Sequence, residues 1–154
     1  MRPVQLPAAL LAEMSAHGRA TYPEECCGFL IGALQETTRP GARTILAVEP
    51  ADNRSTGERT RRFLIPPDEL RTLERRLGTT DQAVVGFYHS HPDHPARPSQ
   101  FDQDHAWPWY TYLVLSVTAT GTPVVGAFEL DPDAERFREV RLSVTEEEAT
   151  VTSG

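Results

Sequence analysis

The sequence contains no lysine, and all 15 of its basic residues are arginine. The 22 acidic residues outnumber them, giving a net charge of −7 at pH 7. A nucleic-acid-binding surface needs a surplus of basic residues, so DNA or RNA is excluded as the main partner. The missing lysine has two interpretations. It protects the chain from modification on lysine side chains, or it reflects a compositional bias in a chain with 13 prolines.

Cysteine and long apolar runs are also scarce. Cys26 and Cys27 are adjacent and cannot form a useful disulfide, which excludes a secreted, disulfide-stabilised fold. No segment reaches the roughly 18 apolar residues of a membrane span, and the first residues lack the apolar core of a signal peptide. We therefore expect a cytoplasmic protein that does not bind a membrane.

What the sequence does contain fits one folded domain. It has 154 residues, of which 39% are hydrophobic. We predict a catalytic domain over residues 1–144, followed by a flexible acidic tail over residues 145–154. No internal repeat or linker divides the chain.

The spacing of apolar residues predicts three helices and several strands. The helices are expected over residues 6–19, from Pro67 to Gly78 and near residues 100–106. The strands are expected over residues 25–33, 44–49, 61–65, 83–89, 110–118, 123–130 and 135–144. Helices and strands alternate early and strands cluster late, which predicts an α/β fold with a single mixed β-sheet flanked by helices.

The segment from Tyr88 to His105 holds a candidate metal site. Side chains two residues apart on a strand point to the same face, so His89 and His91 are expected side by side. Asp102 follows eleven residues after His91, across a loop long enough to bring its carboxylate to the same ion. Two histidines, a carboxylate and one open position are typical of catalytic zinc.

The same residues have a simpler structural interpretation. Two histidines at a strand end are often only polar surface residues. Ser99 and Asp102 also form a capping box, in which Ser99 begins a helix and the acidic side chain three residues later completes the cap. The two interpretations are compatible, because a capped helix can present a metal ligand from its first turn.

At this point the sequence resembles a known family. The run His89-Ser90-His91-Pro92, with Ser99 and Asp102 downstream, resembles the full signature of the JAMM (MPN+, JAB domain) zinc metallopeptidases. Upstream, residues 25–28 (Glu-Cys-Cys-Gly) resemble the Glu-x-x-Gly segment of the first core strand in that family. Segments 62–67, 106–108 and 112–117 are similar to compact bacterial members. The resemblance covers roughly residues 5–130, in order.

The resemblance implies a role for each matching residue. His89, His91 and Asp102 would ligate one Zn²⁺ ion, in a layered architecture like that of cytidine deaminases. Glu25 would act as general base and then general acid. Ser99 would donate a hydrogen bond to the oxyanion of the tetrahedral intermediate. Glu24 is the rival base, but the three-residue spacing to Gly28 favours Glu25.

Other residues near the signature have open roles. His94 and His105 are expected to be solvated or to support the site from outside. Cys27 is expected to pack as a small apolar group. Trp107 and Trp109 are expected to pack in the core or on the surface, with a substrate channel as the alternative. A basic cluster in the predicted loop 51–60 and just beyond it could attract an acidic partner or simply be solvated; it comprises Arg54, Arg59, Arg61 and Arg62.

The resemblance implies hydrolysis of an amide or isopeptide bond after the C-terminal glycine of a ubiquitin-like or sulfur-carrier protein, whose tail would be the partner. The tail would bind in extended form along a strand edge. A non-catalytic MPN-type scaffold is the alternative, although scaffolds of this type usually lack metal ligands. A zinc deaminase would need a Pro-Cys-x-x-Cys pair, and the adjacent cysteines do not provide one.

Overall fold

The structure is a computed structural model that describes residues 2–34, 41–55, 59 and 65–146. Its elements in chain order are β1 (Val4–Pro7), α1 (Ala8–Thr21), β2 (Cys27–Ala33), β3 (Arg43–Thr44), β4 (Ala47–Ala51), α2 (Pro67–Leu77), β5 (Gln82–Pro92), α3 (Gln100–Asp104), β6 (Thr111–Val117), β7 (Val124–Asp131), β8 (Arg136–Val140) and β9 (Leu142–Thr145).

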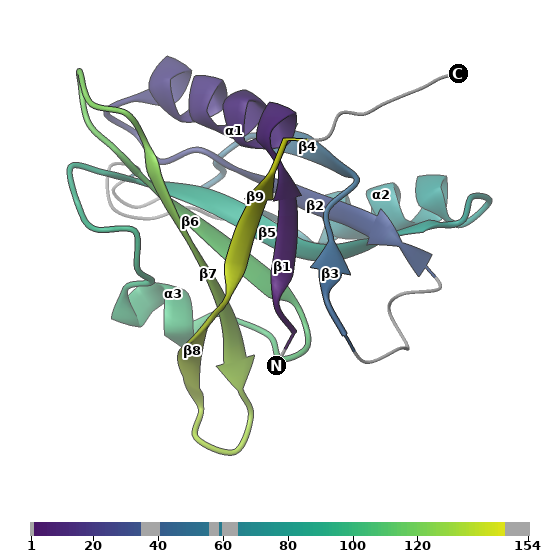
Figure 1. Ribbon diagram of the computed structural model, residues 1–154. Helices are drawn as coiled ribbons and strands as arrows, with labels where there is room; N and C mark the ends of the chain where they lie inside the picture. Colours follow the sequence, from purple (N-terminus) through teal and green to yellow (C-terminus); the bar gives the residue numbers. More distant parts are fainter. Residues whose placement is uncertain (1, 35–40, 56–58, 60–64, 147–154) are drawn as a thin grey trace.

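A mixed six-stranded sheet in the order β4-β2-β5-β6-β7-β8 forms the centre of the molecule (Figure 1). Only β5 and β6 run parallel, and every other neighbouring pair is antiparallel. Parallel neighbours need a crossover connection, and here it contains α3. The predicted α/β fold with a mixed sheet flanked by helices is confirmed.

The two faces of this sheet bury separate cores. On one face, Leu30, Tyr88 and Leu113 pack with Met14 of α1 and with the strand β1. On the opposite face, Phe87 and Val114 pack with apolar residues of α2. Alternation along β5 therefore sends Phe87 toward α2 and Tyr88 toward α1, which also decides the face on which His89 and His91 emerge.

A second, three-stranded sheet in the order β3-β1-β9 lies on the α1 face, beside α1 (Figure 1). Both of its strand pairs are parallel. This sheet was not predicted, and it corrects the start of the first helix. Leu6 belongs to β1, where it is fully buried, and α1 begins at Ala8. Gly18 does not end α1, which continues to Thr21, and it is buried. It packs closely against β6, because an added Cβ would lie 3.0 Å from a Val117 methyl group.

Two predicted strands each divide between the two sheets. Segment 44–49 becomes β3 and β4, which are separated by Ile45 and Leu46. Segment 135–144 becomes β8 and β9. The predicted strand 61–65 lies almost entirely outside the described residues, and Ile65 itself is in no strand. The strand β5 is longer than predicted and extends through Pro92.

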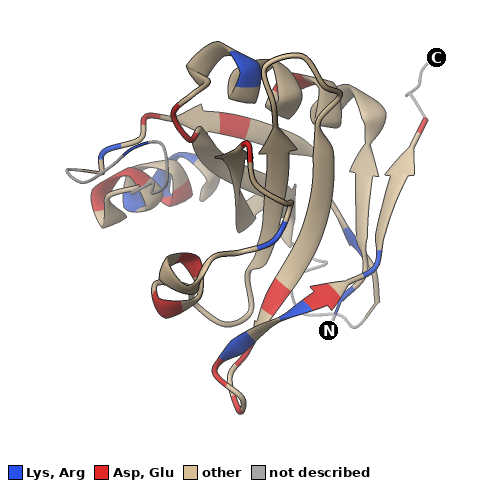
Figure 2. Cartoon of the chain, turned by 90° about the vertical axis from the view of Figure 1, so that its left-hand side faces the viewer, with Lys and Arg blue, Asp and Glu red and all other residues tan. Residues whose placement is uncertain are grey.

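The charged residues lie mainly on helices, loops and the β7–β8 hairpin, while the central strands carry few (Figure 2). Along α2, Asp68 and Glu69 occupy the first turn and Arg75 and Arg76 the last, an order that favours the helix dipole. Among the described residues, no helix combines the length and the apolar character needed to cross a membrane. The strand β9 ends at Thr145, so the boundary at residue 144 stays a prediction.

Candidate active site

The candidate site lies at the carboxyl end of β5, on the α2 face of the six-stranded sheet. His89 and His91 are both buried there, with 1% and 7% of their surfaces exposed. Ser90 between them points to the other face. Because β5 and β6 are parallel and joined by a crossover, the chain that leaves β5 must pass over this end of the sheet. That crossover returns Asp102 to the two histidines.

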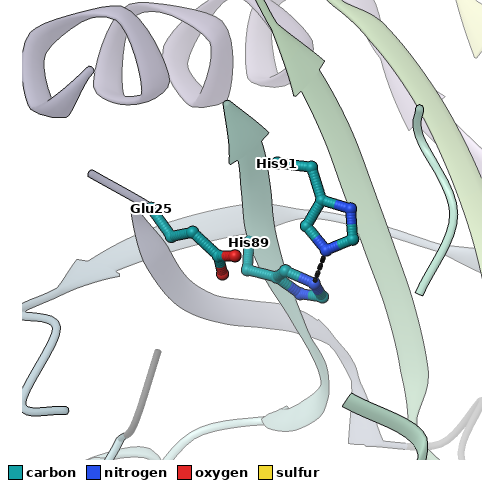
Figure 3. A group of neighbouring side chains, drawn as sticks. All are labelled: Glu25, His89 and His91. Atoms are coloured by element: carbon teal, nitrogen blue, oxygen red, sulfur yellow. Dashed lines mark hydrogen bonds between the residues drawn. The ribbon is translucent and has the colours of Figure 1, made fainter. Parts of the chain in front are cut away.

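Asp102 meets both imidazoles through one oxygen atom. Its Oδ2 lies 3.0 Å from Nε2 of His89 and 3.0 Å from Nε2 of His91. The two Nε2 atoms lie 3.3 Å apart (Figure 3). The structure thus brings three potential ligand atoms from His89, His91 and Asp102 into one small triangle.

The size of this triangle suits a zinc ion. Ligand atoms bonded at about 2.0–2.1 Å to a tetrahedral zinc ion lie about 3.3–3.4 Å from one another. The three observed separations are close to this value. The second carboxylate oxygen, Oδ1 of Asp102, is buried without a hydrogen-bond partner among the described groups, as expected for a carboxylate whose charge a cation would balance. The donor set therefore fits zinc.

Hydrogen bonds and nearby charges set the tautomer of His91 and the pKa values of His91 and Asp102. Nδ1 of His91 lies 3.2 Å from the carbonyl oxygen of Pro95 and can donate to it, which leaves Nε2 free for a metal. Burial alone would lower the pKa of His91. The hydrogen bond and the negative charge of Asp102 outweigh burial, so the pKa of His91 is raised. Burial would raise the pKa of Asp102, but the charge and hydrogen bonds of the histidines hold it well below its usual range.

Glu25 faces the two histidines from the segment just before β2. One of its oxygens and one ring nitrogen of each histidine all lie within 4.8 Å of one another (Figure 3). Glu25 is 2% exposed, whereas Glu24 is exposed to solvent. The structure therefore places Glu25, and not its rival Glu24, beside the histidines.

The backbone of Glu25 is held by a loop that follows β4. Its N–H donates to the carbonyl oxygen of Arg59 at 2.7 Å, and its carbonyl oxygen accepts from the Asn53 side chain at 3.2 Å. The backbone of the next residue, Cys26, is hydrogen-bonded to Ser90 of β5. These contacts come from distant parts of the chain, and no local sequence signal indicated them.

The environment of Glu25 favours its protonated form in the metal-free protein. Burial raises the pKa of Glu25 to about 8, the charge of His91 opposes this rise, and the charge of Asp102 adds to it. Its Oε1 has no hydrogen-bond partner among the described residues. A carboxyl group whose pKa lies near neutrality can exchange a proton with substrate or water.

Gly28 allows β2 to pass close to Tyr88 of β5. A Cβ at position 28 would lie 2.3 and 2.5 Å from two ring carbons of Tyr88 and 2.6 Å from its hydroxyl oxygen, closer than side-chain packing permits. The hydroxyl of Tyr88 in turn lies 2.7 Å from Nδ1 of His17 on α1. The glycine three residues after Glu25 thus keeps β2 and β5 in contact beside the site.

Ser99 begins α3 as a complete capping box. Its hydroxyl oxygen accepts from the Asp102 N–H at 3.1 Å, and its own N–H donates to Asp102 Oδ2 at 2.8 Å. The predicted cap is confirmed. Because the hydroxyl oxygen serves as acceptor in the cap, the hydroxyl proton is available to a substrate.

Two cavities adjoin the site. One of about 500 Å³ is mostly aromatic and reaches His89 and Asp102; its apolar lining includes Phe87, Phe101, Trp107 and Tyr112. The other, of about 340 Å³, is called the polar cavity because most of its lining residues carry polar or ionisable side chains; it is lined by Glu25, His91, His94, Pro95, Arg97, Pro98 and Ser99. The candidate site therefore lies between the aromatic cavity and the polar cavity.

The remaining candidates divide between these cavities, the surface and the core. His94 lines the polar cavity, and His105 lines the aromatic one with its ring stacked on Phe101. Trp107 lines the aromatic cavity, whereas Trp109 covers the guanidinium of Arg43 at 4.5 Å. Cys27 is fully buried, with its sulfur 3.9 Å from the carbonyl oxygen of Ala51.

The basic cluster is only partly described. Arg54 forms an ion pair with Glu69 at 3.5 Å. Arg59 donates from Nε to the carbonyl oxygen of Ser55 at 3.0 Å, and its own carbonyl oxygen accepts a hydrogen bond from the N–H of Glu25. Arg61 and Arg62 lie outside the described residues. Within the described part of the cluster, Arg59 supports Glu25 through its backbone, a role that the sequence did not indicate.

Comparisons with known proteins agree with this fold. The desampylase of Haloferax volcanii is 37% identical over 123 residues, which make up 79% of this chain and 79% of that protein. The solution structure of a Desulfitobacterium hafniense protein has 29% identity, covers 94% of both chains and gives a TM-score of 0.78. The solution structure of a Salinibacter ruber protein has 37% identity, covers 97% of this chain and 95% of that one, and gives a TM-score of 0.66.

A family model also matches most of the chain. The model for prokaryotic homologs of the JAB domain matches residues 7–131, a range that contains every residue of the candidate site. The chain therefore belongs to the JAB-domain (JAMM/MPN) family, in its prokaryotic branch.

Proposed function

We propose that this protein is a zinc-dependent peptidase that hydrolyses the amide or isopeptide bond after the C-terminal glycine of a ubiquitin-like or sulfur-carrier protein. The observation that carries the proposal is the convergence of His89, His91 and Asp102 on one point, with the buried Glu25 beside them. The buried cysteines form no disulfide, which is compatible with action in the cytoplasm.

Membership of the JAB-domain family and the desampylase relative support the substrate class. The name of that relative denotes removal of a ubiquitin-like modifier, and the alignment covers 79% of both chains. A non-catalytic scaffold would not need a buried carboxylate beside two buried histidines. Burying such groups costs stability unless a ligand or partner balances their charge.

His89, His91 and Asp102 would hold the zinc ion. When bound, zinc would polarise the substrate carbonyl and lower the pKa of water toward neutrality. Oε1 of Glu25 would take a proton from the attacking water and deliver it to the leaving nitrogen as the carbon–nitrogen bond breaks. The hydroxyl of Ser99 would donate a hydrogen bond to the oxygen that becomes negatively charged.

The positions of the two cavities suggest how a substrate lies across the site. The leaving nitrogen must be near Glu25, which would protonate it, and Glu25 lines the polar cavity. The acyl side, which carries the tail of the ubiquitin-like protein, would then extend past His89 toward the aromatic cavity. Apolar side chains of such a tail would pack against Phe101 and Trp107.

The proposal is tested by incubating the zinc-loaded protein with sulfur-carrier and ubiquitin-like proteins of the same organism. Each substrate is extended by one residue beyond its C-terminal glycine, or linked through that glycine to a lysine. Mass spectrometry should show cleavage after the glycine. Glu25→Gln should lower kcat/KM by about 10²- to 10⁴-fold while zinc stays bound.

Glu24→Gln is the matched control, because the exposed neighbour carries the same charge and should retain full activity. A protein that binds no zinc and cleaves none of these substrates would contradict the proposal and favour the scaffold interpretation.

A further inference from the structure

The loop between β5 and α3 is fixed at almost every residue. Asp93 donates its N–H to the carbonyl oxygen of Val117 at 2.7 Å, and its side chain accepts from the Tyr22 hydroxyl at 2.6 Å. The carbonyl oxygen of His94 accepts from the Ser116 hydroxyl at 2.5 Å. This end of the loop is therefore attached to β6 and to the end of α1.

The rest of the loop is equally constrained. The carbonyl oxygen of Pro95 is bonded to His91, and the Ser99 cap fixes the far end. The carbonyl oxygen of Ala96 lies so close to β7 that a Cβ on Gly126 would approach it to 2.7 Å. Glycine is needed there for the loop to pack against the sheet. The backbone around Arg97 is thus held in place.

Arg97 is the exception within this fixed loop. Its N–H is bonded to Pro95, but in the part of the chain that the structure describes its guanidinium forms no ion pair. The side chain is exposed and lines the polar cavity together with Glu25, His91 and Ser99. A fixed backbone therefore presents a cation that pairs with none of the described acidic residues to the compartment that would receive the leaving group.

We propose that Arg97 binds a carboxylate carried by the leaving group, and so selects substrates that end one residue after the scissile bond. This inference rests on the proposed function. When the leaving group is a single amino acid, its α-carboxylate is one carbon away from the nitrogen that Glu25 protonates. A lysine side chain released from an isopeptide bond carries no carboxylate near its nitrogen.

The chemistry of arginine and its place in the cavity support this assignment. The planar guanidinium of arginine can bind a carboxylate through two parallel hydrogen bonds. Among the described residues that line this cavity, Arg97 is the one arginine.

The test compares four substrates built on one ubiquitin-like protein. The first ends in Gly-Gly-Ala with a free carboxylate, and the second carries the same alanine as a C-terminal amide. The third ends in Gly-Gly-Asp amide, which moves the carboxylate to a side chain. The fourth is an isopeptide to lysine. Wild type should favour the free acid over the alanine amide in kcat/KM by about tenfold or more, as expected for a hydrogen bond between charged groups.

Arg97→Gln should reduce this ratio to near one, and Arg97→Lys should retain part of it. Arg19→Gln removes an exposed charge on α1 and should leave the ratio unchanged. If the aspartyl amide is favoured as strongly as the free acid, the bound carboxylate is a side chain and the single-residue preference is wrong. Calorimetry in the Glu25→Gln background gives a second measurement, in which Arg97→Gln should weaken binding of the free acid selectively.

The two proposals fail in different ways. Cleavage with the same acid-to-amide ratio in wild type and Arg97→Gln would overturn the role of Arg97 and leave the proposed function intact. No cleavage of any of the four substrates would overturn the proposed function, and this inference with it.

Discussion

The hydroxyl oxygen of Ser90 accepts a 2.8 Å hydrogen bond from the N–H of Cys26, whose carbonyl oxygen accepts one of 3.1 Å from the N–H of Ser90. Ser90 lies between the two histidines, and Cys26 follows Glu25. This pair therefore links the proposed base to the strand that carries two of the proposed ligands, through the face of the sheet opposite the site.

Ser90→Ala should misplace Glu25 without removing a ligand. Losing one buried hydrogen bond costs about 1 kcal/mol. If the displaced Glu25 weakens the transition state by the same amount, kcat should fall by about fivefold. Zinc content, measured by atomic absorption, should stay at one ion per chain. Ser15→Ala, at a buried serine of α1, is the control and should leave kcat unchanged. An unchanged kcat in Ser90→Ala would mean that this link does not position Glu25.

Asp102→Asn should remove the charge from the ligand triangle while keeping an acceptor for the cap at Ser99. Zinc affinity should fall by at least about 100-fold, because residues that only support a ligand already contribute about 10–100-fold. Competition with a fluorescent chelator measures the affinity. Asp104→Asn on the same helix is the matched control, since that carboxylate bonds only to Gln100 in the described structure. Equal affinities for the two variants would remove Asp102 from the ligand set.

Glu25 should make the metal-free protein less stable as the pH rises. Its ordinary pKa of 4.5 is raised to about 8 in the folded state, so between these values the unfolded chain loses its proton first. The contribution of Glu25 to the free energy of unfolding is therefore fully present below pH 4.5 and is lost as the pH rises toward 8. Urea denaturation in the presence of a chelator should show Glu25→Gln to be more stable than wild type at pH 8, and closer to it at pH 5. A difference independent of pH would contradict this assignment.

Gly28→Ala should destabilise the fold through the Tyr88 ring. The added methyl group would lie 2.3–2.5 Å from ring carbons, and overpacking of this kind costs about 1–3 kcal/mol. Urea denaturation measures the change in the free energy of unfolding. Gly78→Ala, after α2, serves as the control, because its φ of −63° suits alanine. A loss in Gly28→Ala no larger than in the control would show that the ring moves freely.

The sequence predicted the parts of the site that depend on local geometry. The shared face of His89 and His91 follows from strand alternation, and the cap of Ser99 on Asp102 follows from spacing within one helical turn. The strands β2, β5, β6 and β7 of the six-stranded sheet were predictable because each is a separate apolar segment. Each of these features needs only a few neighbouring residues.

The parts that the sequence did not predict depend on contacts between distant segments. Leu6 and Pro7 were predicted as the start of a helix, because the partners of β1 in the second sheet, β3 and β9, are far along the chain. The bonds that hold Glu25 come from Asn53 and Arg59, in a loop with no periodic pattern. Propensity describes such segments poorly, since tertiary pairing decides their conformation.

The ligand set is the central claim, and a crystal structure of the zinc-loaded protein with anomalous data at the zinc edge tests it most directly. We expect one anomalous peak bonded to Nε2 of His89, Nε2 of His91 and Oδ2 of Asp102, with Glu25 close by but not bonded to the ion. A peak bonded to Glu25 in place of Asp102, or no peak near the histidines, would contradict the account.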